Sequence, residues 1–305
     1  MFRRLIERMR GLRRAAPSFL RPANVEADRA KISVAQLDHH YANKVVALKD
    51  VNLNVRSGEF VCLLGPSGCG KSTLLYALAG HVVPTGGRVA IEGKPIHGPG
   101  PDRLLMFQEA ALFPWLTVRG NITFALAARG VPRAERRERA NAFIQRVRLE
   151  GFEDTLPHQL SGGMKMRASL ARALAVDPTV LLMDEPFGAL DAQTRVHMQE
   201  LLQSIWIRSG KTVVFVTHDV QEALMLGTRV VLMAPRPGRV VEDLEIHLPM
   251  PRSLEDPSLD AMARDIRHRL RASEGPSVEA PPAEPLQRRT RTPSSLPRTS
   301  VVTGR

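Results

Sequence analysis

Through the middle of the chain, short apolar runs alternate with stretches whose apolar residues recur at helical spacing. The apolar runs have strand length and occupy residues 59–64, 179–183, 212–216 and 229–233. Helical patterns occupy residues 72–80, 141–149 and 161–175, and a further helix begins near Asp219. Strands that alternate with helices at this spacing pair in parallel and are covered on both faces. We therefore predict an α/β fold built on a parallel sheet.

The composition agrees with a folded core of ordinary size. Of the 305 residues, 43% are hydrophobic and 24% are charged, which is typical of a globular protein. The two cysteines, Cys62 and Cys69, are too few for a disulfide framework and favour a reduced, cytosolic compartment. No apolar run approaches the ~20 residues that a membrane-spanning helix needs, so we expect a chain that is soluble or at most peripheral to a membrane.

A glycine-rich turn joins the first predicted strand to the first predicted helix. It satisfies the phosphate-loop pattern G-x-x-x-x-G-K-[ST] and reads Gly65, Pro66, Ser67, Gly68, Cys69, Gly70, Lys71 and Ser72, followed by Thr73. The glycines let backbone N–H groups point at phosphate oxygens, beside the positive end of the helix dipole. Lys71 then reaches the β- and γ-phosphates, and the Ser72 hydroxyl can ligate Mg²⁺. Alone, this motif indicates a nucleoside triphosphate and no particular reaction.

Two adjacent carboxylates, Asp184 and Glu185, follow the strand predicted at 179–183. A carboxylate at the end of a buried strand can hold Mg²⁺, and we assign that role to Asp184. Glu185 has no structural reason to follow another acid. We interpret it as the general base that polarises water, a role typically worth ~10²–10⁴-fold in rate. The open alternative is an acidic turn that leads into Pro186.

A third segment, Leu160-Ser161-Gly162-Gly163-Met164, opens the helix predicted at 161–175. A helix that starts this way offers free N–H groups to a phosphate. Further along the chain follow Asp184-Glu185, Gly188-Ala189-Leu190-Asp191 and His218. With the phosphate loop, these motifs make the chain resemble the nucleotide-binding subunit of an ABC transporter over about residues 31–250.

The resemblance implies a fold and a dimer. The fold is a P-loop NTPase core with a parallel sheet, an antiparallel β subdomain and a helical subdomain. The nucleotide is ATP, bound with Mg²⁺. In the dimer, two subunits stand head to tail, and Ser161, Gly162 and Gly163 close on the γ-phosphate of the ATP that the partner subunit holds.

Single residues carry over from the resemblance one at a time. Gln108 matches a glutamine that touches Mg²⁺ and the attacking water and that senses the permease. His218 matches the switch histidine on the γ-phosphate, so the catalytic candidates are Glu185, His218, Lys71 and Gln108. Asp191 matches an aspartate of the loop after Gly188, and Tyr41 matches an aromatic ring that stacks on adenine. Taken alone, His218 beside Asp219 reads as a helix-cap residue, and Asp191 reads as an N-cap; both alternatives stay open.

The resemblance and the composition divide the chain into four parts. We predict a basic N-terminal extension at 1–28 and an ATPase domain at 29–252, with its helical subdomain at about 110–176. A C-terminal helix at 253–272 and a tail at 273–305 follow. The tail is rich in Pro, Ser, Thr and Arg. Such a composition cannot bury enough apolar surface to offset its chain entropy, so we predict a disordered tail.

Three stretches, at 108–118, 234–239 and 248–252, look like the nitrate, sulfonate and taurine import group of these ATPases. The chain departs from the wider family at 164–167, which reads Met-Lys-Met-Arg where a glutamine is usual near 166. Ser161 and Gly163 are unchanged, so we expect ATP hydrolysis. The resemblance implies a subunit that energises an importer of nitrate, sulfonate, taurine or a related small solute, at the cytoplasmic face of the inner membrane.

The same resemblance implies three kinds of partner. The first is an integral membrane permease, contacted by the region after Gln108, with Pro114 and Trp115 as candidate contacts. The second is a periplasmic or extracellular solute-binding protein, reached indirectly through the permease. The third is a second ATPase subunit, which is either identical or a paired homologue.

The net charge of +12 first suggests nucleic acid or an anionic membrane surface. Residues 1–22 contribute +6 and residues 251–305 contribute +3, which leaves +3 for the 228 residues between them. So small an excess in the core disfavours nucleic acid, and we predict no nucleic-acid partner. A non-transport ABC ATPase that acts on nucleic acid or ribosomes is the alternative. The Arg-rich N-terminus fits an amphipathic helix on an anionic membrane or a disordered extension, and both stay open.

Overall fold

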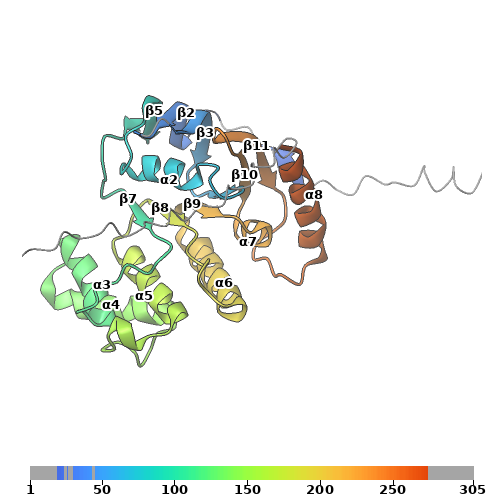
Figure 1. Ribbon diagram of the computed structural model, residues 1–305. Coiled ribbons are helices and arrows are strands. Elements are labelled where there is room, and N and C mark those ends of the chain that lie inside the picture. The colour runs from blue at the N-terminus through green and yellow to red at the C-terminus, as the bar shows by residue number, and fades with distance from the viewer. Residues whose placement is uncertain (1–18, 24–25, 27–29, 43–44, 274–305) are drawn as a thin grey trace, which may run out of the picture. The chain divides into compact units, whose positions relative to one another are not determined.

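The computed structural model describes residues 19–23, 26, 30–42 and 45–273, and Figure 1 shows how their strands and helices are arranged. These residues form two sheets, one mostly parallel and one antiparallel. Helix α2 (Lys71–Ala79) contacts strands of both. The turn that precedes α2 is the phosphate loop, so the loop lies where the two sheets approach each other.

Seven of the described strands form the larger sheet, in the order β1-β11-β10-β4-β9-β8-β7. Their bounds are β1 (Leu20–Pro22), β11 (Arg239–Ile246), β10 (Arg229–Ala234), β4 (Phe60–Leu64), β9 (Thr212–Thr217), β8 (Val180–Asp184) and β7 (Arg103–Met106). Neighbours from β10 to β7 run parallel, whereas β11 and β1 pair antiparallel. The predicted parallel sheet is confirmed, and the four apolar runs of the sequence are β4, β8, β9 and β10.

The central strands are covered on both faces. In β4, Phe60, Cys62 and Leu64 pack into the core beneath the helices α5 to α8, while Val61 and Leu63 pack into the core that contains α2. Successive side chains of a strand point to opposite faces, so a strand that is apolar at every position needs cover on both sides. Because both faces are covered, the motif residues lie at the uncovered carboxyl ends of β4, β8 and β9.

The smaller sheet has the strand order β3-β2-β5-β6 and is antiparallel throughout. Its strands are β3 (Val46–Arg56), β2 (Ala30–His40), β5 (Gly86–Ile91) and β6 (Lys94–Pro95). Ile32, Leu53 and Val89 from its inner face pack with Leu75 of α2 in one core. The antiparallel β subdomain that the resemblance implied is therefore present.

Between β7 and β8 the chain forms a helical part, which lies apart from the smaller sheet in Figure 1. It contains α3 (Val118–Ala128), α4 (Arg133–Arg146), the 3₁₀ turn η2 (Pro157–Gln159) and α5 (Gly162–Ala175). The helix predicted at 141–149 begins earlier, at Arg133, and ends at Arg146. Its first turns are exposed, so they lack apolar positions, but Arg, Glu and Ala are strong helix formers.

Three helices complete the described chain: α6 (Ala192–Ser209), α7 (Val220–Leu226) and α8 (Pro257–Ser273). Helix α8 packs on α7, which lies beside β4. None of the helices in the described part of the chain is long and apolar enough to cross a membrane.

The predicted extension at 1–28 differs from the structure at one point. Leu20–Pro22 form β1, which pairs with β11, so these residues belong to the core sheet. Pairing at a sheet edge needs only an extended backbone and no apolar pattern. Three residues of mixed polarity therefore could not be recognised as a strand from the sequence. Residues 1–18, for which an amphipathic helix and a disordered extension both stay open, lie outside the described residues, as do residues 274–305 with the predicted disordered tail.

Candidate active site

The phosphate loop turns sharply into the first turn of α2. Gly70 precedes the helix with φ of 89°, and a Cβ at this position would lie 2.6 Å from Cδ2 of Leu48. The Lys71 ammonium donates hydrogen bonds to the carbonyl oxygens of Gly65 at 2.8 Å and Pro66 at 2.9 Å. Lys71 is buried at the N-terminus of α2. Its positive charge adds to the positive end of the helix dipole, and both stabilise an anion bound at the loop.

The other loop residues have unequal positions. Ser67 and Gly68 are exposed at the tip of the loop. The Cys69 side chain is fully buried beneath the tip, and burial raises the pKa of its thiol. The backbone at 65–70 is therefore the part of the loop available to a phosphate, and the Cys69 side chain supports it from below.

A set of oxygen atoms gathers where α2 meets the end of β8. The Ser72 hydroxyl donates to Oδ1 of Asp184 at 2.9 Å, and Asp184 is only 7% exposed. Tyr76, one helical turn after Ser72, also hydrogen-bonds to Asp184. Burial, followed by that bond and the carboxylate charge, raises the pKa of Tyr76 to about 12. The phenol therefore stays protonated beside Asp184 at neutral pH.

These oxygens fit Mg²⁺. The ion takes one or two carboxylates and completes its octahedron with waters and substrate phosphates, and Ser72 and Asp184 supply a hydroxyl and one carboxylate beside the phosphate loop. No cluster of three or more His, Cys, Asp or Glu side chains able to hold a metal occurs within residues 19–23, 26, 30–42 and 45–273.

Glu185 stands beside this oxygen set with an unusual backbone. Its φ is 41°, in the left-handed region, and its N–H donates to the carbonyl oxygen of Val216 at 3.0 Å. Its Oε2 lies 2.9 Å from Nδ1 of His218. A Cβ added at Gly188 would lie 3.3 Å from Nε2 of Gln108 and 3.9 Å from Oε2 of Glu185. The fold therefore gathers Glu185, His218 and Gln108 around Gly188.

Hydrogen bonds from the neighbouring residues hold the turn that carries His218. Asp219 caps α7 by accepting from the N–H groups of Gln221 and Glu222, so the cap role belongs to Asp219 and not to His218. The Thr217 hydroxyl accepts from the N–H of Asp219 and donates to the Glu222 carboxylate at 2.5 Å. His218 is left with an exposed ring directed at Glu185.

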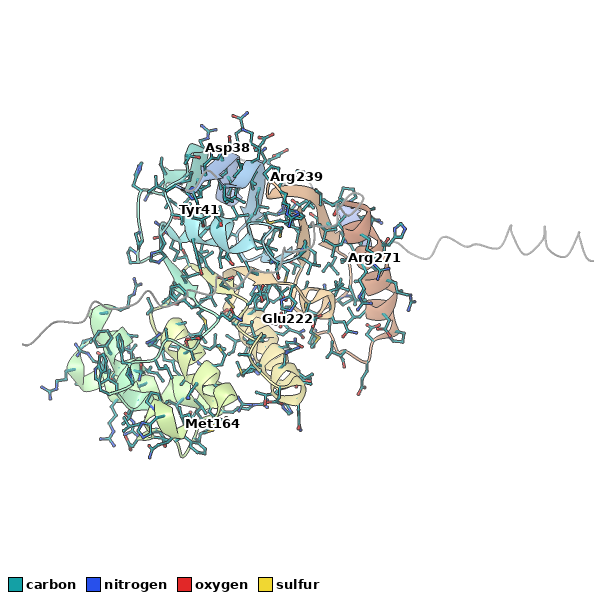
Figure 2. All side chains as sticks on the ribbon, viewed as in Figure 1. Asp38, Tyr41, Met164, Glu222, Arg239 and Arg271 are labelled. Atoms are coloured by element: carbon teal, nitrogen blue, oxygen red, sulfur yellow. The ribbon has the colours of Figure 1, made fainter. Side chains whose placement is uncertain are left out.

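Glu222 is a buried acid behind this turn and is labelled in Figure 2. It accepts from Thr217 and, at 3.2 Å, from Nε2 of Gln199 on α6. Burial raises the pKa of its carboxyl group. Glu222 thus ties the end of β9, which holds His218, to α6.

The Ser161 segment and Asp191 form a second group, away from α2. Ser161 caps α5 by accepting from the N–H of Met164 at 3.3 Å, and Asp191 caps α6 by accepting from the N–H of Thr194 at 3.0 Å. That backbone bond, with others, lowers the pKa of Asp191. The N-cap alternative for Asp191 is thus observed. Figure 2 shows Met164 at the far end of the helical part from Tyr41, so the subunit does not bring Ser161–Gly163 to its own phosphate loop.

Tyr41 lies next to the phosphate loop. Its hydroxyl is 3.0 Å from Oγ1 of Thr73, and its ring meets the His39 ring edge-on at a centroid distance of 4.7 Å. Tyr41 is 43% exposed, so one side of the ring is open to stacking. His39 is buried, and neither of its ring nitrogens has a hydrogen-bond partner among the described residues.

Sequence reasoning missed three supporting residues: Tyr76, Glu222 and Thr194. Tyr76 follows Ser72 by four positions, and residues at that spacing share a helix face, so its approach to Asp184 could have been predicted. Thr194 follows the N-cap Asp191 by three positions, a spacing that predicts their hydrogen bond, but its contact with Gly163 at the start of α5 depends on the fold. The contacts of Glu222 with Thr217 at the end of β9 and with Gln199 on α6 also depend on the fold.

The chain is similar to known ATP-binding proteins. The chain matches the family model described as ABC transporter over residues 48–188. A putative ATP-binding protein of Brucella abortus (strain 2308) is 52% identical over 208 residues, which cover 68% of this chain and 80% of that protein. The taurine import ATP-binding protein TauB of Pseudomonas putida is 53% identical over 199 residues, covering 65% and 76%, respectively.

Two solved structures are also similar. One is the dimeric, post-hydrolysis structure of the ATP-binding cassette MJ0796 bound to ADP and Pi. It is 34% identical with a TM-score of 0.63, and the match covers 72% of this chain and 100% of that one. The other is cbiO1 from Clostridium perfringens, part of the ABC transporter complex cbiONQ. It is 28% identical with a TM-score of 0.67, and the match covers 80% of this chain and 97% of that one.

Proposed function

The chain belongs to the ABC transporter family of ATP-binding proteins, and from that premise we propose that it energises the import of taurine, another sulfonate, nitrate or a related small solute. It binds ATP, and it hydrolyses ATP in a cycle coupled to transport. The observation that carries the proposal is the pairing of Ser72 with Asp184 and of Glu185 with His218 at one end of the parallel sheet. The solute class rests on relatives that include TauB.

Phosphate binding begins at the N-terminus of α2. The backbone N–H groups at 65–70 surround the β- and γ-phosphates, and Lys71 exchanges its bonds to the carbonyls of Gly65 and Pro66 for bonds to phosphate oxygens. Ser72 and Asp184 would hold Mg²⁺, which neutralises charge on the phosphates. Tyr41 stacks on adenine, with its hydroxyl anchored by Thr73.

Glu185 polarises the attacking water. Its carboxylate points to the space beside Gly188, and the amide of Gln108 lies near enough to hold the same water. His218 fixes the carboxylate through Nδ1, which leaves Nε2 for a γ-phosphate oxygen. Since phosphoryl transfer depends on positioning and charge stabilisation, this placement supplies what the reaction requires.

A second subunit completes each ATP site. Ser161, Gly162 and Gly163 stand at the N-terminus of α5, where unpaired N–H groups attract phosphate, but they lie away from Tyr41 in the same subunit. We infer that they serve the ATP of the partner in a head-to-tail dimer, with Asp191 at the shared boundary. The subunits of this family are dimeric, as in the MJ0796 cassette.

This chain has a surface near Gln108 that is suitable for binding the membrane permease. Trp115 is 73% exposed, and Phe124 and Phe107 are also exposed. A mostly apolar groove of about 310 Å³ is lined by Phe107, Phe113 and Phe124. Exposed aromatic side chains around a groove are typical of an interaction site. We propose that a permease segment binds here, which places the subunit at the cytoplasmic face of the membrane, with a solute-binding protein on the other side.

The alternative of an ATPase that acts on nucleic acid or ribosomes gains no support. The relatives include taurine import proteins of Pseudomonas putida and Burkholderia pseudomallei, and the core carries little excess positive charge. We therefore do not propose it further.

Uptake by the host cell tests the proposal. Deletion of the gene should abolish uptake of one of three labelled solutes: taurine, a linear alkanesulfonate or nitrate. The wild-type gene should restore that uptake and Glu185→Gln should not. Unchanged uptake of all three solutes would refute the proposed solute class.

The purified protein tests the role of Glu185 separately. Glu185→Gln should lower ATP turnover by about 10²-fold or more, because the carboxylate that polarises water is lost while nucleotide binding remains. With MgATP the variant should elute as a dimer in size-exclusion chromatography. Glu138→Gln, which neutralises an exposed carboxylate on α4, is the matched control and should behave as wild type. Near-normal turnover by Glu185→Gln would contradict the assigned role.

A further inference from the structure

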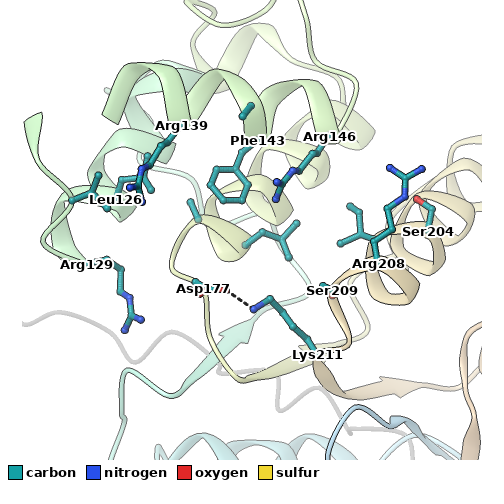
Figure 3. Close-up of a pocket in the computed structure, with 15 residues that line it drawn as sticks. Leu126, Arg129, Arg139, Phe143, Arg146, Asp177, Ser204, Arg208, Ser209 and Lys211 are labelled. Atoms are coloured by element: carbon teal, nitrogen blue, oxygen red, sulfur yellow. Dashed lines mark hydrogen bonds and ion pairs between the residues drawn. The ribbon is translucent and has the colours of Figure 1, made fainter. Parts of the chain in front are cut away.

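A second cavity lies outside the ATP site, between the helical part and the end of α6. Its volume is about 840 Å³, within the usual range for small-molecule sites. Figure 3 shows Phe143 of α4 pointing into it, with α6 on one side and the Asp177–Lys211 pair below. Leu126, Leu174 and Ile205 add further apolar surface. A ligand in this cavity would therefore meet an apolar wall.

The charged groups that line the cavity are almost all positive. They are Arg129, Arg139, Arg146, Arg208 and Lys211, against one carboxylate, Asp177. In Figure 3 these cations stand around the space, from α3, α4, α6 and the turn after α6. A concave surface lined by one sign of charge concentrates its field and attracts the opposite charge.

Contacts within the protein account for only part of this charge. Lys211 pairs with Asp177 at 2.6 Å, and Arg139 pairs with Glu135 at 2.6 Å. The Arg146 guanidinium lies 5.1 Å from the centre of the Phe143 ring, a contact that leaves its charge uncompensated. Arg129 and Arg208 make no ion pair within the described residues.

The positions of three of these arginines at helix C-termini explain in part why positive charges occur there. Arg129 is the C-cap of α3, and Arg146 and Arg208 lie in the last turns of α4 and α6, where a cation interacts favourably with the helix dipole. That effect favours each arginine singly at its own helix end. It does not require three helix ends to converge on one cavity with an apolar wall.

We propose that this cavity binds an anionic molecule with an apolar body, such as an organic sulfonate, carboxylate or phosphate. The anionic group lies between Arg146 and Arg208, neither of which pairs with a carboxylate in the described part of the chain, and the apolar body packs on Phe143 and Ile205. The chemistry is common to free organic anions and to anionic lipid head groups. The site is separate from the phosphate loop and independent of the solute that the transporter carries.

Binding of 8-anilinonaphthalene-1-sulfonate to the full chain, with saturating MgADP in the phosphate loop, tests the proposal. The dye joins a sulfonate to an apolar ring system, and its fluorescence reports binding. The double variant Arg146→Gln and Arg208→Gln should raise the Kd by about tenfold or more, because charge-assisted hydrogen bonds are lost. Arg137→Gln is the matched control, since Arg137 is exposed on the same helix but does not line the cavity.

A neutral probe separates charge recognition from apolar binding. N-phenyl-1-naphthylamine has the same ring system without the sulfonate, and its affinity should be equal in all three proteins. Equal dye affinity in the double variant and the wild type would overturn the proposal. So would an equal loss for the neutral probe.

A vesicle assay identifies the source of the anion. In sedimentation with vesicles of equal phosphatidylglycerol and phosphatidylcholine, weaker binding of the double variant than of Arg137→Gln supports a lipid head group. Equal vesicle binding, combined with lost dye binding, supports a free organic anion. Thermal unfolding of each variant shows that the substitutions leave the fold intact.

Discussion

The Tyr76 phenol lies one helical turn from Ser72 and shares Asp184 with it. Tyr76→Phe removes this donor and leaves the carboxylate less firmly oriented. Loss of such a supporting bond typically costs about 10–100-fold in metal affinity or activity, so the Mg²⁺ concentration for half-maximal turnover should rise by about tenfold. Nucleotide binding without Mg²⁺ should not change. An unaltered Mg²⁺ dependence would show that Ser72 alone orients Asp184.

The buried Glu222 predicts a pH dependence of stability. Burial raises its pKa above the ordinary 4.5, so over the interval between the two values the folded protein holds a proton that the unfolded chain has released. The stability that Glu222 contributes is therefore fully present below pH 4.5 and is lost as the pH rises through its folded pKa. Glu222→Gln should remove this fall, measured by urea unfolding at several pH values.

The same variant should keep its hydrogen bonds. The new carbonyl accepts from Thr217. The Gln199 amide, whose Nε2 now donates to Glu222, must turn over so that its unpaired Oε1 accepts from the new amide. The His218 turn should therefore persist, and ATP turnover should stay within about twofold of wild type, because residues outside the reacting centre contribute mainly through position. A steeper pH dependence in the variant would contradict this account.

Contact between α5 and α6 links the Ser161 segment to the Asp191 loop. A Cβ added at Gly163 would lie 2.4 Å from Cγ2 of Thr194, and rotation of Thr194 would break its side-chain bond to Asp191. Gly163→Ala should therefore destabilise the protein by about 1–3 kcal/mol, the usual cost of overpacking. Adding Thr194→Ser, which removes Cγ2, should restore most of the thermal stability. Without that rescue, the clash is not the cause.

At the level of elements, the sequence predicts what is local and misses what depends on pairing. The strands β4, β8, β9 and β10 are buried throughout and carry the apolar runs of the sequence, and the motif residues lie at their ends or in the turns after them. By contrast, β1 has only three residues, and α4 begins in a polar, exposed stretch. The first is a strand only because β11 offers it an edge, and the second carries no apolar face in its first turns. Neither property is readable from a hydrophobic pattern.

In the candidate active site, too, the residues of local motifs could be predicted from the sequence, whereas contacts between distant elements could not. Lys71, Asp184 and Glu185 were identified from motifs, and the fold brings Asp184 to Ser72 and His218 to Glu185. Whether these residues act as proposed is for the variants above to decide. The contact of Thr194 with Gly163 and that of Glu222 with Gln199 could not be identified from the sequence, since each joins two elements that are distant in the chain.

Across the whole molecule, Arg229 joins the two sheets. It is 2% exposed on β10, pairs with Asp243 of β11 and Glu59 before β4, and donates to the carbonyl oxygen of Asn54 on β3 at 2.7 Å. Arg229→Ala leaves the Asp243 carboxylate without its cation, removes one of the two arginines that pair with Glu59, and should lower the free energy of unfolding by about 3–5 kcal/mol. Arg88→Ala, at an exposed position on β5, should change it by less than about 0.5 kcal/mol. Equal loss in both variants would rule out Arg229 as the link.

The left-handed backbone of Glu185 bears on how this protein can be improved. A side chain at that φ costs the native state free energy that glycine would not, so folding alone does not favour glutamate there. Selection for thermostability or expression, without selection for transport, would therefore drift towards glycine at position 185 and lose catalysis. An engineering programme on this chain should hold that position fixed and seek its stabilising substitutions elsewhere.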